Sequence, residues 1–297
     1  MHGELFETTI RWLEGRKVYR NDSSIASVWI YLMLLKWRAA LRDALPPRAV
    51  HAYRALRHTI LWPTELEMVA AQRFLSRDTI AVDIGANMGL FTSVLARHCE
   101  RVIAFEPNLS CARHLKKVLP SNCEIICKAV SDGCGTSVLR VPSQGGVALD
   151  ALGTIEAENE FGTEGRVTDV KSCAVQTVSL DEALSRLTSN DRVGFINVDA
   201  EGHEFAVLRG SAKTLAAHRP TLLIELEYRH GSAVDEVIGW MKERQYAAFG
   251  LIDNKKLAPI DAATLRHFQS EDRLRRRLAG DRHAGYLNNV FFIRVPD

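Results

Sequence analysis

From residue 79 to the end of the chain, short apolar runs alternate with longer stretches whose apolar residues recur at helical spacing. This alternation is typical of βαβ units, in which parallel strands form a sheet that helices cover. We therefore predict a doubly wound α/β domain over residues 78–297, with helices after its first two strands at 90–98 and 109–118. The predicted strands comprise residues 79–84, 101–106, 124–130, 193–198, 221–226, 246–252 and 289–294.

Residues 1–77 have a different character, because they are basic and their pattern is helical. The first 60 residues carry ten Lys or Arg against five Asp or Glu. Pro46-Pro47 cannot continue a helix, so a break is expected there. The apolar run 25–35 is shorter than the roughly 20 residues that are needed to span a bilayer. It is therefore interpreted either as a buried helix or as a helix at a membrane interface with basic flanks. We predict a helical N-terminal extension that caps the site, mediates homodimerisation or contacts a membrane surface.

The charge and the cysteines indicate the compartment and the class of partner. With 38 Lys and Arg against 36 Asp and Glu, the net charge of +2 is too small to indicate a nucleic-acid partner. Of the six cysteines, Cys123 and Cys127 are four residues apart, but no second Cys or His pair at metal-ligand spacing accompanies them, so reduced thiols are expected. The first 20 residues contain no apolar segment typical of a signal peptide. We expect a cytoplasmic protein that does not bind nucleic acid.

A long connection at residues 135–171 interrupts the regular alternation. It is rich in glycine and lies between two β-like runs at 137–141 and 172–178. Long connections of this kind are uncommon in compact domains and often form lids or binding loops. We predict that this segment shapes a substrate pocket.

The first predicted strand runs into a glycine turn, Asp83-Ile84-Gly85-Ala86-Asn87-Met88-Gly89, and then into a helix. Glycine lets the backbone pass close to a ligand, and the start of the helix presents free N–H groups to it. Glu106 ends the next predicted strand, 21 residues after Gly85. In a doubly wound sheet, an acid at that point accepts hydrogen bonds from ribose hydroxyls. The two features together predict a nucleoside site.

The residues of the turn favour one nucleoside ligand over another. A dinucleotide fingerprint has three glycines, but here Asn87 takes the place of the middle one. Asn tolerates left-handed backbone better than most residues do. Asp83, just before the turn, would repel a pyrophosphate and attract a cationic amino group. S-adenosyl-L-methionine carries an α-amino group and a sulfonium but no phosphate, so we favour it over NAD.

Several segments of the chain resemble the FkbM family of methyltransferases, over about residues 64–297. They are Asp83-x-Gly-x-Asn-x-Gly89, Phe105-Glu106-Pro107-Asn108, Ala129-Val130-Ser131-Asp132, Asp199-x-Glu201-Gly202-His203-Glu204, Leu208-Arg209-Gly210 and Pro220 followed by Glu225. The resemblance implies a seven-stranded, Rossmann-like methyltransferase sheet with S-adenosyl-L-methionine as cofactor. By that similarity Asp83, Gly85, Asn87 and Gly89 hold the methionine part, Glu106 the ribose, and Val130, Ser131 and Asp132 lie near the adenine. The family often has Lys two residues before the acid that ends its fourth strand, whereas this chain has Asn197.

The segment after the fourth predicted strand carries the residues that we expect to act on a substrate. Ligands of open α/β sheets bind beyond the carboxyl ends of the strands, where Asp199 lies and Glu201 and His203 follow. A hydroxyl is a poor nucleophile, so a positioned base should remove its proton during methyl transfer. Asp199, Glu201 and His203 are the candidates, with Glu225 behind them. Alternatively, His203 is an ordinary hydrogen-bonding residue, and Glu201 and Glu204 interact with the helix dipole.

Two other interpretations of these acids are weaker. Several carboxylates near a hydroxyl could hold Mg²⁺, but no dense pattern of oxygen ligands is visible, so no metal site is predicted. Methyltransferases that act on the amino groups of bases commonly place Asn or Asp before Pro-Pro-aromatic, whereas Ala200-Glu201-Gly202 follows Asp199 here.

These observations together predict an O-methyltransferase that acts on a hydroxyl of a sugar, a glycolipid or a hydroxylated natural product, its acceptor being a small molecule or a glycan. Two rival functions use the same features. In an NAD(P)-dependent reductase, Glu106 could likewise accept hydrogen bonds from the ribose of the cofactor. A non-catalytic protein that binds adenosyl ligands would have the same fold.

Overall fold

The computed structural model describes residues 46–56, 66–145, 147–156, 167–230, 233–252, 256–279, 281 and 284–295. By contacts between residues, the chain divides into two units, Met1–Val50 and His51–Asp297. Within the described residues, no helix has the length and apolar character needed to cross a membrane. The apolar run 25–35 lies outside them, as does most of the predicted N-terminal extension. Its contact with a membrane surface or a second copy therefore stays a prediction.

Two helices precede the sheet. α3 (Pro47–Leu56) begins at the second proline of the predicted break, and proline suits the first position of a helix. α4 (Leu66–Ala71) continues into a 3₁₀ turn, Gln72–Phe74, and buries Ala70 and Ala71. These alanines pack in one apolar cluster with Phe91 and Phe195. The residues just before the predicted boundary at 78 thus contribute to the core of the sheet domain.

The main sheet is mixed and has the strand order β11-β10-β12-β9-β8-β1-β2-β3. β12 runs antiparallel to β9 and to β10, and β11 antiparallel to β10. The predicted doubly wound α/β fold is confirmed, with β11 as an eighth strand at the edge. The strands are β1 (Ile80–Ile84), β2 (Arg101–Phe105), β3 (Cys123–Ile126), β8 (Val193–Val198), β9 (Thr221–Glu225), β10 (Tyr246–Ile252), β11 (Lys256–Pro259) and β12 (Asn289–Arg294).

One predicted strand is wrong, because residues 124–130 form two strands. β3 ends at Ile126, where the amide of Lys128 donates to the Ile126 carbonyl at 3.0 Å. β4 (Ala129–Ser131) then leaves the main sheet and pairs in parallel with β7. Apart from Glu124 and Lys128 the run is apolar, and it contains no Gly or Pro to mark the turn that divides it between two sheets.

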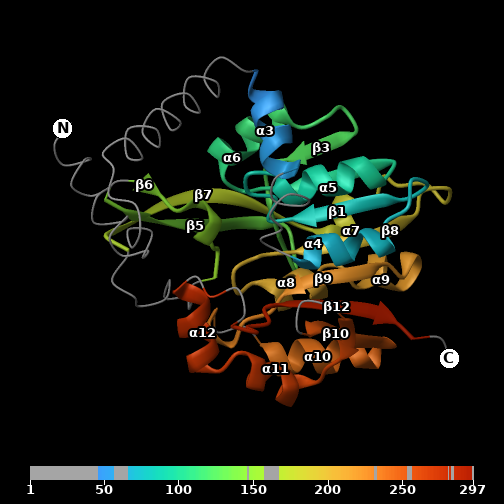
Figure 1. Cartoon of the computed structure of the whole chain (residues 1–297). Coiled ribbons are helices and arrows are strands. Elements are labelled where there is room, and N and C mark those ends of the chain that lie inside the picture. Colours follow the sequence, from blue (N-terminus) through green and yellow to red (C-terminus); the bar gives the residue numbers. More distant parts are fainter. Residues whose placement is uncertain are drawn as a thin grey trace, which may run out of the picture. The chain divides into compact units, whose positions relative to one another are not determined.

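The second sheet has the order β4-β7-β5-β6. β5 (Gly135–Gln144) and β7 (Asp169–Ser179) contain the two β-like runs and pair antiparallel; β6 is Val147–Ala148. In Figure 1 these strands lie on the side towards which β1 points. The connection therefore stands at the carboxyl end of β1, although its residues 157–166 lie outside the described ones.

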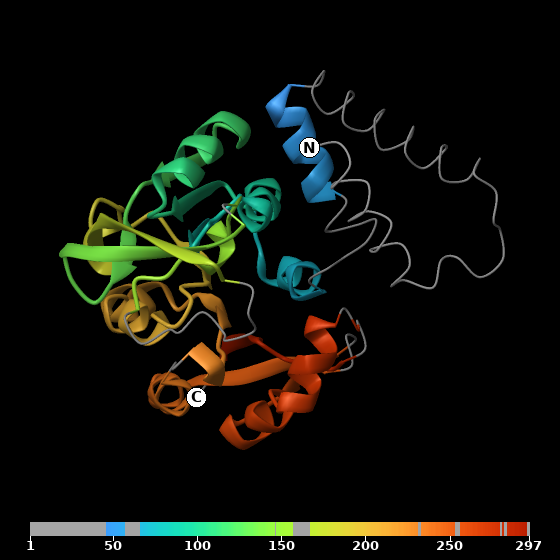
Figure 2. The ribbon, with the colours of Figure 1, turned by 90° about the vertical axis from the view of Figure 1, so that its left-hand side faces the viewer.

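Helices cover both faces of the main sheet, because successive side chains of each strand point to opposite faces. Ile80, Val82 and Ile84 of β1 belong to a core cluster with apolar residues of the helices after β7, β8 and β9, whereas Ala81 faces α4 and α5. Figure 2 shows both groups, α4 and α5 in teal and α8 and α9 in orange. The helices are α5 (Leu90–His98), α6 (Leu109–Val118), α7 (Leu180–Ala183), α8 (Glu204–Arg209), α9 (Ala212–His218), α10 (Val234–Glu243), α11 (Ala262–Phe268) and α12 (Glu271–Leu278).

Candidate active site

The carboxyl ends of β1, β2 and β8 meet at the point where the strand order reverses, between β1 and β8. Backbone hydrogen bonds join the three ends. The amides of Gly85 and Ala86 both donate to the Phe105 carbonyl at 3.0 Å, and the Asp199 amide donates to the Ile84 carbonyl at 3.0 Å. Such a reversal point is where open α/β sheets bind their ligands.

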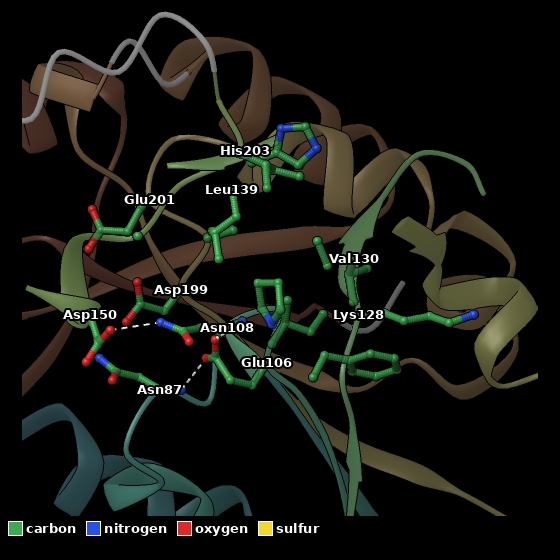
Figure 3. A pocket seen from close by; sticks show the side chains of 18 of the residues that line it. Asn87, Glu106, Asn108, Lys128, Val130, Leu139, Asp150, Asp199, Glu201 and His203 are labelled. Carbon is green, nitrogen blue, oxygen red and sulfur yellow. Dashed lines mark hydrogen bonds between the residues drawn. The ribbon is translucent and has the colours of Figure 1, made fainter. Parts of the chain in front are cut away.

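A cavity that opens to solvent lies at this point, and the space between its atoms is about 630 Å³ with open solvent included. Figure 3 shows the side chains that project into it from both sheets. The lining residues are Ile84, Gly85, Asn87, Phe105, Glu106, Pro107, Asn108, Lys128, Ala129, Val130, Leu139, Val141, Asp150, Gly153, Ile155, Asp199, Ala200, Glu201 and His203.

The glycine turn has the left-handed backbone that its residues suggested. The φ angles of Gly85, Asn87 and Gly89 are 81°, 47° and 78°. A Cβ at Gly85 would lie 1.8 Å from the Asp199 carbonyl oxygen, so this glycine is required for β1 and β8 to pack closely. Gly89 caps α5 and does not line the cavity. The side-chain oxygen of Asn87 is buried and has no hydrogen-bond partner among the described residues.

Glu106 lies where the sequence placed it, at the end of β2 and inside the cavity. Its carboxylate accepts from the backbone amides of Asn87 and Asn108, each at 2.7 Å (Figure 3). Burial raises the pKa of Glu106 to about 7, although both amides oppose the rise. The two bonds fix the direction of the carboxylate, which suits a hydrogen-bond acceptor for a ligand.

Asp83 does not line the cavity, contrary to the expectation that its carboxylate meets a cationic ligand. It is 1% exposed and accepts from Thr92 Oγ1 at 2.5 Å and from Asn197 Nδ2 at 2.9 Å. Asp83 and Asn197 are paired in register across β1 and β8, which points both side chains to one face of the sheet. Burial raises the pKa of Asp83, and the two hydrogen bonds oppose this. Asn197, which stands where the family often has Lys, thus donates a hydrogen bond to Asp83, the acid before the glycine turn.

Of the three residues expected near an adenine, the structure places one in the cavity. Val130 lines it, together with Lys128 and Ala129. The Ser131 hydroxyl lies 2.9 Å from His203 Nε2, and Asp132 forms an exposed salt bridge with Arg209 at 2.9 Å. The hydrogen bond from Arg209 lowers the pKa of Asp132. Ser131 and Asp132 therefore do not line the cavity, and their side chains contact His203 and Arg209 instead.

His203 lines the cavity, but both of its ring nitrogens are engaged. Nδ1 donates to Glu156 Oε2 at 2.9 Å, since a carboxylate only accepts. In the neutral ring, Nε2 then accepts from the Ser131 hydroxyl. Thr154 Oγ1 also donates to the Glu201 carbonyl at 2.8 Å. These bonds tie the segment after β6 to the loop after β8.

Asp199 and Glu201 lie together, and Glu225 at the end of β9 joins them. One carboxylate oxygen from each of the three lies within 4.8 Å of the other two. Glu201 has a φ of 50° and Gly202 a φ of 103°, an uncommon backbone that functional sites often tolerate. In Figure 3, Asp199 and Glu201 lie on the same side of the cavity as Asp150.

The electrostatics of the three carboxyls follow from burial and crowding. Burial, followed by the charges of Glu225 and Glu201, raises the pKa of Asp199 well above its ordinary value. Burial and the charges of Glu225 and Glu204 do the same for Glu201. Burial also raises the pKa of Glu225. Like charges in a poorly solvated site disfavour simultaneous ionisation of the group.

Glu204 has a local structural role. It is 1% exposed, and its carboxylate accepts from the amides of Ala200 at 3.2 Å and Gly202 at 3.0 Å. Burial raises its pKa to about 7, with these amides opposing the rise. Glu204 thereby holds the loop that presents Glu201 and His203.

Three polar residues of the cavity were not among the predicted site residues. Asn108 caps α6 through its side-chain oxygen and donates from Nδ2 to Asp150 at 2.8 Å. Lys128 lies at the turn between β3 and β4. Asn108 stood within a recognised motif, but no local pattern marks Asp150 or Lys128, because the second sheet brings them to the cavity.

Residues 83–248 match a family model described as the methyltransferase FkbM domain. This match spans more than half of the chain and includes the carboxyl ends of β1, β2 and β8, at which the cavity lies. No curated protein is significantly similar to the chain in sequence.

Solved structures of methyltransferases are similar at low identity. The methyltransferase FkbM from Methylobacillus flagellatus is 17% identical with a TM-score of 0.42, over 73% of this chain and 44% of that protein. An rRNA methylase from Streptococcus thermophilus is 12% identical with a TM-score of 0.39, over 80% of this chain and 99% of that one. An O-methyltransferase from Bacillus cereus, solved with S-adenosylhomocysteine, is 11% identical with a TM-score of 0.40, over 96% of both chains.

Proposed function

Because this chain belongs to the FkbM family of S-adenosylmethionine-dependent methyltransferases, we propose that it methylates a hydroxyl group of a sugar, a glycolipid or a hydroxylated natural product. The observation that carries the proposal is the convergence of two sets of groups on one cavity. The glycine turn and Glu106 suit the nucleoside, and the carboxyls of Asp199 and Glu201 lie where a hydroxyl can reach them.

The residues at the ends of β1 and β2 fit S-adenosylmethionine. Glu106 is already oriented by two backbone amides and can accept from ribose hydroxyls. The orphaned, buried oxygen of Asn87 lacks a donor, and an α-amino group would supply one. In this proposal Asn87 takes the role first expected of Asp83, which instead supports the turn from inside the sheet. Val130 and Lys128 would lie along the nucleoside.

When bound, S-adenosylmethionine supplies a methyl group on a positively charged sulfur. The protein must place the acceptor oxygen in line with that sulfur and must take the hydroxyl proton. We assign the proton to the carboxylate of Asp199 or Glu201, because both line the cavity and burial makes each a stronger base than an exposed carboxylate. No Pro-Pro-aromatic segment follows Asp199, which argues against an amino group of a base as acceptor.

His203 is assigned a positioning role in this proposal. With Nδ1 bonded to Glu156 and Nε2 close to Ser131, the ring holds the segment around Ile155 against the cavity. This segment, with Leu139 and Val141 of β5, forms the wall that the acceptor would contact.

The assignment of Glu106 is tested by isothermal titration of S-adenosylhomocysteine into the Glu106→Ala variant. Hydrogen bonds to a charged group contribute about 1.5–3 kcal/mol, so the affinity should fall at least about tenfold while circular dichroism stays unchanged. Glu124→Ala, which removes an exposed acid of the neighbouring strand β3, should bind like the wild type. An unchanged affinity in Glu106→Ala would contradict the placement of the ribose.

The reaction is tested with methyl-labelled S-adenosylmethionine and a panel of sugars, glycolipids and hydroxylated natural products. Mass spectrometry should locate the label on an oxygen. Label on nitrogen would contradict O-methylation. Binding of S-adenosylhomocysteine without transfer to any hydroxyl would indicate a non-catalytic binding protein, and binding of NAD(H) in its place a reductase.

A further inference from the structure

Asp150 is an acid of the cavity to which the proposed function gives no role. It is half-buried and begins a short 3₁₀ turn after β6. On one side of Asp150, the Leu149 amide donates to the Pro142 carbonyl of β5 at 2.8 Å. On the other side, Thr154 exchanges two backbone hydrogen bonds with Arg140 of β5, at 2.9 and 3.0 Å. The carboxylate is therefore attached to backbone whose position is fixed before a ligand binds.

Hydrogen bonds connect Asp150 to the end of the cavity at β1 and β2. Asn108 donates from Nδ2 to Asp150 Oδ1 at 2.8 Å and from its backbone amide to Glu106 Oε1 at 2.7 Å. The Asn87 amide donates to the other carboxylate oxygen of Glu106, also at 2.7 Å (Figure 3). Burial raises the pKa of Glu106 to about 7, and the charges of Asp83 and Asp150 add to the rise. Asp150 thus lies close enough to Glu106 for their charges to interact.

The described residues leave two hydrogen-bond acceptors open at this end of the cavity. They are the second carboxylate oxygen of Asp150, whose first oxygen accepts from Asn108, and the buried side-chain oxygen of Asn87. The basic residues among the described lining residues are Lys128 and His203. In Figure 3 the side chain of Lys128 extends away from Asp150, and both ring nitrogens of His203 are engaged elsewhere. An anionic oxygen and a neutral one are therefore available to a ligand, with no described cation of the cavity between them.

Two acceptors of this kind suit a positively charged group that donates hydrogen bonds. An ammonium group has three N–H donors and no acceptor, and its bonds to a carboxylate are stronger than bonds between neutral groups. In S-adenosylmethionine, the α-amino group is the part that combines charge with donors. The sulfonium is charged but has no donor, and the ribose and adenine have donors but no charge.

We propose that Asp150 binds the α-ammonium group of the cofactor, with Asn108 fixing its carboxylate and the side-chain oxygen of Asn87 as the second acceptor. This inference rests on the proposed function, because it names a further residue that recognises the same cofactor. It also extends the role of the long connection at 135–171, which was predicted to shape a substrate pocket. That connection then supplies the negative charge first expected of Asp83.

Isothermal titration of two ligands into the full chain separates the α-amino group from the rest of the cofactor. S-adenosylhomocysteine carries this group, and its desamino analogue lacks that group alone. Asp150→Asn keeps the shape of the side chain and the acceptor for Asn108. The variant should bind S-adenosylhomocysteine at least about tenfold more weakly, because a hydrogen bond between charged groups is lost, and should bind the analogue no more weakly than the wild type does. Glu106→Ala should weaken the binding of both ligands, since both contain the ribose.

Asp169→Asn is the matched control, because it makes the same change at an exposed acid of β7, in the second sheet but outside the cavity. It should bind both ligands as the wild type does, and circular dichroism should show that each variant is folded.

The assignment of Asp150 is overturned if Asp150→Asn binds S-adenosylhomocysteine with wild-type affinity. It is also overturned if this variant binds both ligands equally weakly, which would assign Asp150 to the ribose. Equal affinities of the wild type for the two ligands would overturn it as well, and this comparison does not depend on the folding of a variant. In each of these cases S-adenosylhomocysteine still binds, so the proposed function stands. A wild type that does not bind S-adenosylhomocysteine at all would overturn the proposed function together with this assignment.

Discussion

The two ends of the cavity contain buried carboxyls in contrasting surroundings. At the ends of β1 and β2, Glu106 is held by two backbone amides at 2.7 Å. At the ends of β8 and β9, Asp199 and Glu201 crowd against Glu225, and one oxygen of Asp199 has no donor among the described residues. The comparison shows that the carboxylate at the first end is oriented by backbone donors, whereas the carboxyls at the second end crowd against one another. The first suits recognition of a constant ligand, and the second suits chemistry.

Gly85 joins the two ends, so its substitution should have the largest effect. In Gly85→Ala the new Cβ would lie 1.8 Å from the Asp199 carbonyl oxygen, at a φ of 81°. We expect a loss of about 3 kcal/mol or more in the free energy of unfolding, measured by chemical denaturation. Gly239→Ala is the control, because this exposed glycine of α10 has open space around its Cβ position. It should gain up to about 1 kcal/mol. Equal stabilities would show that the two ends are not packed as described.

Asp199→Asn should separate the functions of the two ends. It retains the shape of the side chain but removes a base, so kcat for methyl transfer should fall by about 10²–10⁴. The affinity for S-adenosylhomocysteine should stay within about threefold of the wild type, because Glu106 and Asn87 are untouched. A matching loss of nucleoside binding would mean that Asp199 belongs to cofactor recognition instead.

The pH dependence of nucleoside binding should be the smallest effect. Burial raises the pKa of Glu106 to about 7, and ribose hydroxyls bind its ionised form. Below that pKa, binding must first remove a proton, so the affinity should fall as the pH decreases and level off above it. Between pH 8 and pH 6 the change is about tenfold, measurable by titration of S-adenosylhomocysteine. A pH dependence that persists in Glu106→Gln would assign the titration to another group.

Much of the nucleoside end could be predicted because its information is local. The run Asp83–Gly89 contains a strand end, residues that tolerate left-handed backbone and a helix start within seven positions. Glu106 follows at the end of the next strand, which pairs directly with β1. The position of Glu106 in the cavity therefore follows from the order of neighbouring elements.

The role of Asp83 could not be predicted, because it depends on register. Asn197 lies 114 residues further along the chain and pairs with Asp83 only once β8 aligns beside β1. The side chains of a strand alternate between faces, so the acid that ends a strand can point into the sheet as readily as into a cavity. The same holds for Lys128 and Asp150. They reach the cavity because the strands of the second sheet pair with one another, and no local sequence pattern predicts that pairing.

The sequence by itself determined the alternation of strands and helices, the left-handed turn at Gly85, Asn87 and Gly89, and the family. Only the tertiary structure decided that Asp83 turns into the sheet and that His203 is held between Ser131 and Glu156. The sequence predicted Glu225 behind Asp199 and Glu201, and the structure brings one oxygen of each within 4.8 Å of the other two. The physical reason is that backbone conformation is set by residues close in sequence, whereas the charge around a buried carboxyl is set by whichever strands pack beside it.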